Sequence, residues 1–242
     1  ANYPEIKAIC DEFGLKLIAD TAQGFGCTLN GKHPSDWADI ATTSFFPAKP
    51  LGCYGDGGAI VTNDAKLAEL IESLRVYGKV TPTDAATRNF HHDPKYLSLR
   101  VGMNSRLDTI QAAILLEKLK IFADEIDRRQ VVADRYARGL RGGVKGVPGV
   151  IDGGRSVWAQ YVIEHDNRDG LQAHLTANGI PSMVYYPVPI HQQDFALSYA
   201  PAKGHLKVTE AASQHVLALP MHPYLGEADQ DRIIDTVLGF NG

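Results

Sequence analysis

An aspartate and a lysine stand where their side chains could do chemistry. Asp20 ends the short apolar run 15–19, and Lys49 lies in a turn among Phe, Pro, Ala and Leu residues. Partial shielding of a lysine from water favours its neutral, nucleophilic amine. A pyridoxal phosphate site needs such a pair, because the amine binds the aldehyde and the acid keeps the ring nitrogen protonated.

A serine could complete the cofactor site, but the aspartate and the lysine also have simpler interpretations. Ser44, at the end of the next expected strand, could donate its hydroxyl hydrogen to a phosphate. The residue types alone leave other roles open, however. A carboxylate at a strand end commonly caps a helix, and a lysine beside aromatic residues can extend its amine into water.

The composition is that of an ordinary globular protein. Its 242 residues include 24 Lys and Arg against 28 Asp and Glu, for a net charge of −4. This balance, with 44% hydrophobic residues, excludes a disordered chain and argues against general nucleic-acid binding. No apolar run approaches the ~20 residues of a membrane span, so we expect a cytoplasmic protein with no membrane partner. His91 and His92 lack a third ligand at a useful spacing, so no metal is expected.

Apolar periodicity predicts helices and strands in alternation, which favours a layered α/β fold with parallel strands. Strands are expected at 15–19, 39–46, 59–62, 157–164 and 180–186. Helices are expected at 3–13, 64–77, 105–140, 169–178, 208–217 and 229–238. The polar stretch 78–103 is too irregular for a core element, and its length is typical of a functional or mobile loop. The pattern restarts after the glycine-rich segment 142–154, so we divide the chain into domains 1–125 and 126–242.

Several motifs, in one order along nearly the whole chain, resemble the DegT/DnrJ/EryC1/StrS sugar aminotransferases. They are Ala-Asp-Thr-Ala-Gln (19–23), Ser-Phe-Phe-Pro-Ala-Lys-Pro-Leu-Gly (44–52), Tyr-Gly-Asp-Gly-Gly-Ala (54–59), Gly-Met-Asn-Ser-Arg-Leu-Asp (102–108), Ile-Gln-Ala-Ala (110–113), Tyr-Tyr-Pro-Val-Pro (185–189) and Leu-Pro-Met-His-Pro-Tyr-Leu (219–225). Within that family the chain most resembles enzymes that aminate UDP-linked 3-keto N-acetylhexosaminuronic acids.

The resemblance implies a fold and a cofactor. The fold is that of the fold-type-I pyridoxal-phosphate-dependent transferases: part of a large domain with a mainly parallel sheet, and a small C-terminal α/β domain. It implies that Lys49 holds the cofactor covalently and acts in catalysis, and that Asp20 pairs with the ring nitrogen. The remaining implied contacts are Gln23 beside the ring, Ser44 on the phosphate, Asn104 on the phosphate of the neighbouring subunit, Arg106 on the nucleotide sugar there, and Tyr185 and Tyr186 on the substrate.

The resemblance also implies partners: a nucleotide-sugar substrate, L-glutamate as amino donor, and a second subunit in a homodimer with shared active sites. Family members carry roughly 120 further residues before the equivalent of Ala1, so we expect this sequence to lack an N-terminal part. Three alternatives stay open: a 4-keto-sugar aminotransferase, a non-catalytic regulatory relative, and a related dehydratase. The dehydratases replace the anchoring lysine with histidine, and here that residue is Lys49.

Overall fold

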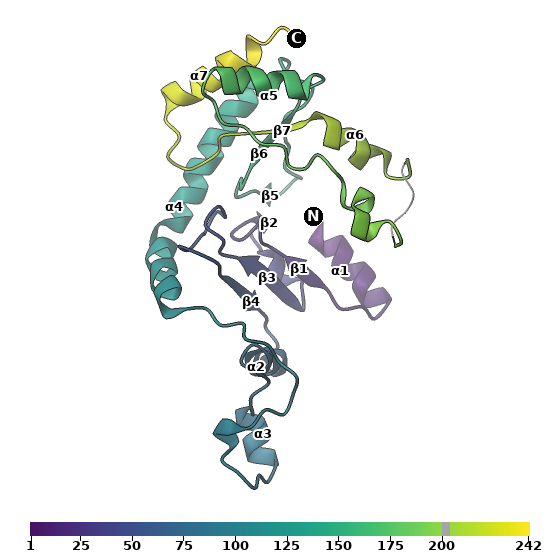
Figure 1. Cartoon of the computed structure of the whole chain (residues 1–242), viewed down its shortest axis with the longest axis vertical. Coiled ribbons are helices and arrows are strands. Elements are labelled where there is room, and N and C mark those ends of the chain that lie inside the picture. The colour runs from purple at the N-terminus through teal and green to yellow at the C-terminus, as the bar shows by residue number, and fades with distance from the viewer. Residues whose placement is uncertain (200–203) are drawn as a thin grey trace. The chain divides into compact units, whose positions relative to one another are not determined.

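The computed structural model describes residues 1–199 and 204–242. The chain forms two compact units (Figure 1). Unit 1 comprises residues 1–122 and 153–155, and unit 2 comprises residues 123–152 and 156–242. The long helix α4 (Thr109–Leu140) contributes its first half to unit 1 and its second half to unit 2.

A three-stranded sheet forms the centre of unit 1, with strand order β1-β3-β4. Strand β1 (Ile18–Asp20) runs parallel to β3 (Ile40–Ser44), as the sequence predicts. Strand β4 (Gly58–Val61) is antiparallel to β3, contrary to the expectation of parallel strands. The short connection 45–57 explains the difference, because a parallel pair needs a longer crossover, usually with a helix.

Helices and a hairpin flank this sheet. Helix α1 (Tyr3–Glu12) is anchored where Tyr3 stacks on Trp37, just before β3. Helix α2 (Ala65–Leu74) starts after its N-cap Asp64, whose carboxylate accepts from two backbone N–H groups. Asn30 and Gly31 form a tight turn, with positive φ at both residues. Strand β2 (Thr28–Leu29) before that turn pairs with β5 (Gly154–Arg155), and the short helix η1 (Pro34–Asp36) follows it.

The stretch 78–103 contains more regular structure than its composition indicates. Helix α3 (Pro82–Thr87) begins with a capping box between Thr81 and Asp84, and η2 (Pro94–Tyr96) follows. The two nitrogens of the Arg100 guanidinium donate to the Asp84 carboxylate at 2.7 and 3.0 Å. This hydrogen bonding, with the Thr81 contacts, holds the pKa of Asp84 well below its ordinary value. A charged pair of a buried Asp84 and a partly exposed Arg100 therefore organises this stretch.

Unit 2 packs helices against a two-stranded antiparallel sheet. Strand β6 (Tyr161–Glu164) pairs with β7 (Val216–Leu219). The other elements of the unit are α5 (Arg168–Ala177), η3 (Ile190–Gln192), η4 (Asp194–Ala196), α6 (Lys207–His215) and α7 (Glu227–Leu238).

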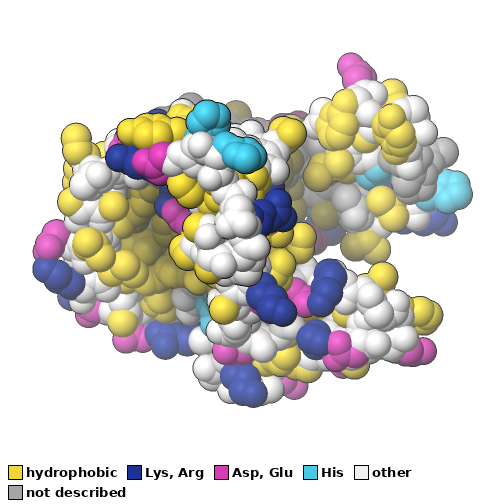
Figure 2. All heavy atoms as spheres, turned by 90° about the horizontal axis from the view of Figure 1, so that it is seen from below, with side chains coloured by type: hydrophobic (Ala, Val, Ile, Leu, Met, Phe, Trp, Pro, Cys, Tyr) yellow, Lys and Arg dark blue, Asp and Glu magenta, His cyan; other side chains and the backbone are white. Residues whose placement is uncertain are grey.

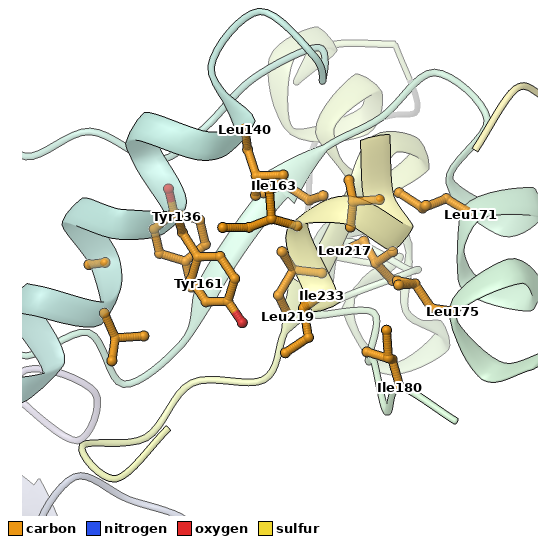
Figure 3. Close-up of a cluster of buried hydrophobic side chains, with 14 of the residues drawn as sticks. Tyr136, Leu140, Tyr161, Ile163, Leu171, Leu175, Ile180, Leu217, Leu219 and Ile233 are labelled. Carbon is orange, nitrogen blue, oxygen red and sulfur yellow. The ribbon is translucent and has the colours of Figure 1, made fainter. Parts of the chain in front are cut away.

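One hydrophobic cluster holds unit 2 together (Figure 3). Tyr136 and Leu140 from α4, Ile163 from β6 and Leu217 from β7 are fully buried at its centre. Helices α5 and α7 close it with Leu171, Leu175 and Ile233. Burial raises the pKa of the Tyr161 phenol to about 12, so that residue stays neutral inside the cluster.

Two expectations in unit 2 are wrong. The segment 180–186 forms no strand and makes only an isolated bridge from Met183 to Ala218. Prolines at 181, 187 and 189 account for this, because proline cannot donate to a strand ladder. The helix expected to reach residue 217 ends at His215, and the next four residues form β7. Periodicity cannot separate a short apolar run in a helix from one in a buried strand.

Among the residues that the structure describes, no helix has both the length and the apolar character needed to cross a membrane. On the face drawn in Figure 2, basic side chains lie beside acidic ones and among exposed apolar side chains.

Candidate active site

The strand register places Asp20 and Ser44 on one face of the unit 1 sheet. Asp20 is paired with Thr42 on the neighbouring parallel strand, and Ser44 lies two residues further along. Residues in register, and residues two apart on a strand, share a face of the sheet. The carboxylate and the hydroxyl therefore lie at the same carboxyl edge, where ligands bind in open α/β sheets.

A buried threonine fixes the turn that follows Asp20. The backbone N–H and the hydroxyl of Thr21 both donate to the Thr42 carbonyl, at 2.7 and 2.8 Å. The Asp20 carboxylate accepts from the Ala22 N–H at 2.9 Å and is otherwise exposed. Gln23 is exposed in the same turn. The turn thus presents a carboxylate and an amide that can bind a ligand.

The phenol of Tyr3 lies near this carboxylate. Burial is the main reason that the pKa of Tyr3 is raised, and the nearby Cys27 and Asp20 raise it further. The Tyr3 hydroxyl therefore stays neutral.

Lys49 lies in a tight turn that begins directly after β3. Its backbone N–H donates to the Phe46 carbonyl at 2.9 Å, and the Cys53 N–H closes the turn on the Phe45 carbonyl at 2.8 Å. The Lys49 side chain is half-buried, and its amine has no hydrogen bond or ion pair within the described part of the chain. An unpaired amine held at the end of a strand is available to bind an aldehyde covalently.

Helix α4 supports the turn from outside. The Gln111 amide makes two hydrogen bonds of 2.7 Å with the backbone of Tyr54, and the Lys118 ammonium donates to the Gly52 carbonyl. Gly52 allows the turn to close, because a Cβ there would lie 2.6 Å from the Pro47 carbonyl oxygen. The position of Lys49 therefore depends on contacts far from it in sequence.

Asn104 and Arg106 form a separate group ahead of α4. The Arg106 Nε donates to the Asn104 side-chain oxygen at 2.9 Å, and the guanidinium lies 5.7 Å from the centre of the Tyr77 ring. Both residues are exposed. They line a hollow of about 980 Å³ along β4, together with Thr42, Arg75 and residues 56–62. Asp20, Ser44 and Lys49 do not line this hollow.

Tyr185 and Tyr186 belong to unit 2. Their rings lie 5.3 Å apart, with Tyr185 half-buried and Tyr186 exposed. The structure therefore brings Asp20 and Ser44 together on one sheet face and joins Asn104 to Arg106. The two tyrosines remain a separate surface feature of their own unit.

Three residues without a role in the sequence-based prediction support the site: Thr21 holds the turn after Asp20, Tyr77 contacts Arg106, and Gln111 binds the backbone of Tyr54 after the Lys49 turn. For Thr21 and Gln111 a signal existed, since both stand inside the motifs quoted for the resemblance. For Tyr77 there was none, because its role depends on a backbone conformation.

The fold defines a class: this chain has the fold of the fold-type-I transferases, of which it contains part of the large-domain sheet and a small α/β unit. The expected fold class is thereby confirmed. The chain belongs to the DegT/DnrJ/EryC1/StrS aminotransferase family, whose model matches residues 1–238.

Individual relatives agree with this placement. The chain is 45% identical to a Pseudomonas aeruginosa UDP-2-acetamido-2-deoxy-3-oxo-D-glucuronate aminotransferase over 94% of its own length and 59% of that protein. It is 40% identical to a Geobacillus stearothermophilus "pleiotropic regulatory protein", covering 99% of this chain and 62% of that one. A solved family aminotransferase from Brucella abortus is 48% identical, with a TM-score of 0.90 over 100% of this chain and 61% of that one. The chain thus spans about three fifths of the length of these relatives.

Proposed function

We propose that the complete protein is a pyridoxal-phosphate-dependent aminotransferase acting on a nucleotide-linked keto-sugar. Amino transfer exchanges the amino group of L-glutamate for the ketone oxygen of the sugar and releases 2-oxoglutarate. The substrate we propose is a UDP-2-acetamido-3-keto-hexuronate, because the Pseudomonas relative is named for that activity. The observation that carries the proposal is the shared sheet face of Asp20 and Ser44, followed by the unpaired amine of Lys49.

The donor set fits pyridoxal phosphate. Asp20 has an exposed carboxylate to pair with a ring nitrogen, and Gln23 lies in the same turn. The Ser44 oxygen accepts from the Phe46 N–H, which leaves the hydroxyl hydrogen free to donate to a phosphate. Lys49 supplies the amine for the aldehyde, and Asn104 would reach the phosphate held by the neighbouring subunit. The bound cofactor supplies an electron sink for the bond broken at the amino-bearing carbon.

The side chains of this protein would hold and transfer the protons and bind the substrate. Asp20 holds the proton on the ring nitrogen, because a carboxylate stabilises a neighbouring cation. The Lys49 Nζ takes the proton from the amino-bearing carbon and later returns a proton to the sugar carbon, so one side chain is both anchor and acid–base. Arg106 and the two tyrosines bind the sugar nucleotide. This assigns residues 1–125 to the cofactor domain and 126–242 to the small domain.

The direct test uses full-length protein with candidate UDP-linked 3-keto and 4-keto sugars and ¹⁵N-glutamate. Mass spectrometry should detect a ¹⁵N-amino sugar from the 3-keto uronate. A product from the 4-keto sugar alone would replace the proposed substrate with the 4-keto alternative. Sugar binding without any product would favour a non-catalytic relative, in line with the similarity to the regulatory protein.

A second test addresses the proposed homodimer. Inactive Lys49→Ala protein is mixed with inactive Asn104→Ala/Arg106→Ala protein under conditions that exchange subunits. If sites are shared, the mixed dimer regains one intact site of two, because both lesions fall in the other site. Proven exchange with no recovered activity would show that each subunit builds its site alone.

A further inference from the structure

Tyr77 has a backbone conformation that a bulky side chain rarely adopts. Its φ is +61°, in the left-handed region that favours glycine. Residues held in that region depend on their surroundings, and they cluster at functional sites. The conformation of Tyr77 therefore calls for an explanation beyond the local turn.

The surroundings of Tyr77 enforce this conformation. The Tyr77 N–H donates to the Met103 carbonyl at 3.1 Å, and the Ser105 N–H donates to the Arg75 carbonyl at 2.9 Å. The two chain segments run so close that a Cβ on Gly102 would meet the Gly78 backbone. These contacts between residues 75–78 and 102–105 thus hold the backbone of Tyr77 in its left-handed conformation.

The Tyr77 ring lies against the guanidinium of Arg106. The distance from the guanidinium carbon to the ring centre is 5.7 Å, within the range of a cation–π contact. Arg106 also donates its Nε hydrogen to the side-chain oxygen of Asn104 at 2.9 Å. The two terminal nitrogens of Arg106 have no hydrogen-bond partner among the described residues. Two neighbours therefore orient the guanidinium and leave its paired donors free, as phosphate binding requires.

We propose that Tyr77 is a positioning residue that holds Arg106 ready for the phosphates of the sugar nucleotide. This inference rests on the proposed function, which assigns Arg106 to that substrate. The left-handed conformation turns the ring toward the guanidinium. Because the ring and Asn104 already order Arg106 in the free protein, its side chain loses less conformational entropy when the substrate binds.

The test uses full-length, cofactor-loaded protein with three variants. Tyr77→Leu removes the aromatic face, Tyr77→Phe keeps it, and Tyr96→Leu is the matched control. Tyr96 lies in the stretch 78–103 that follows Tyr77 and also lies beside a cation, Lys95 at 5.5 Å, and it is 78% exposed against 44% for Tyr77. We expect Tyr77→Leu to raise the Kd for UDP and the KM for the sugar nucleotide by roughly two- to fivefold, the range of an exposed cation–π contact. The kcat and the KM for glutamate should stay unchanged, and Tyr77→Phe should restore wild-type affinity.

Two further measurements separate this inference from the proposed function. In an Arg106→Ala background, Tyr77→Leu should cause no additional loss of UDP affinity. Crystal structures of the full-length variants should show the Arg106–Asn104 hydrogen bond lost in Tyr77→Leu and kept in Tyr77→Phe. Wild-type UDP affinity and an intact hydrogen bond in Tyr77→Leu would overturn the inference. Unchanged UDP affinity in Arg106→Ala would instead refute the assigned role of Arg106, and the crystal structures would still decide the role of Tyr77.

Discussion

Replacing Gly52 with alanine should displace Lys49 without touching any reacting group. Gly52 is buried at the close of the Lys49 turn. An added Cβ would lie 2.6 Å from the Pro47 carbonyl oxygen and 2.7 Å from the Phe46 carbonyl oxygen. Both neighbours are backbone atoms and cannot rotate away. The Phe46 carbonyl also accepts the Lys49 N–H, so the clash acts on the hydrogen bond that shapes this turn.

The size of the effect follows from these distances. To move from 2.6 Å to an ordinary contact of 3.4 Å, the Pro47 carbonyl must shift by about 0.8 Å. Overpacking of a tight site costs about 1–3 kcal/mol of stability. A misplacement of about 1 Å in a catalytic group can cost about 100-fold in rate. We therefore expect Gly52→Ala to lower kcat by about 100-fold, with a loss of stability too small to unfold the protein.

The assay compares Gly52→Ala with Gly149→Ala in full-length protein. Gly149 has no atom within 4 Å of an added Cβ and no positive φ, so its alanine variant should behave as wild type. Turnover, thermal stability and the fraction of Lys49 labelled after borohydride reduction are measured for both. Wild-type turnover in a folded Gly52→Ala protein would refute the idea that this turn sets the position of the lysine.

Three further predictions concern other parts of the chain. Asp20→Asn should keep the shape of the site but lower kcat by about 100- to 1,000-fold, as expected when a key electrostatic partner is removed; near-normal turnover with bound cofactor would mean that another acid acts. Arg100→Ala should loosen residues 78–103, seen as faster hydrogen exchange there. The pKa of Asp84 is lowered in the folded state, so the stability that this pair contributes is present above the unfolded-state pKa and is lost as pH falls through the lower folded-state pKa. The difference in the free energy of unfolding between Arg100→Ala and wild type should therefore become smaller in acid. Leu217→Ala should cost about 2–5 kcal/mol, because the side chain is fully buried; a denaturation midpoint shift worth less than about 1 kcal/mol would contradict the packing.

Local sequence signals predicted the elements that carry the site. The apolar run before Asp20, the strand that contains Ser44 and the helix that starts near residue 64 all occur where their patterns indicate, although the ends differ by a few residues. These features depend on neighbours within a few positions, which a sequence displays directly. The antiparallel direction of β4 and the strand β7 depend on pairing with distant segments, so periodicity could not reveal them.

The same distinction applies to the site. Residue types and motifs identified Asp20, Ser44 and Lys49, and the register of β1 and β3 then places the first two on one face. The motifs include the supporting residue Gln111, but its contact could not be predicted, because the hydrogen bond from Tyr54 to Gln111 crosses 57 positions of sequence. The contact between Tyr77 and Arg106 likewise depends on the left-handed conformation of Tyr77.

The central claim is that Lys49 holds pyridoxal phosphate at the carboxyl edge of the unit 1 sheet. Borohydride reduction of the purified full-length protein, followed by peptide mapping, tests it most directly. We predict one phosphopyridoxyl group per chain, on Lys49, and no stable label in Lys49→Ala. Label on Lys32 or Lys79 instead, or full labelling of Lys49→Ala, would contradict the assignment.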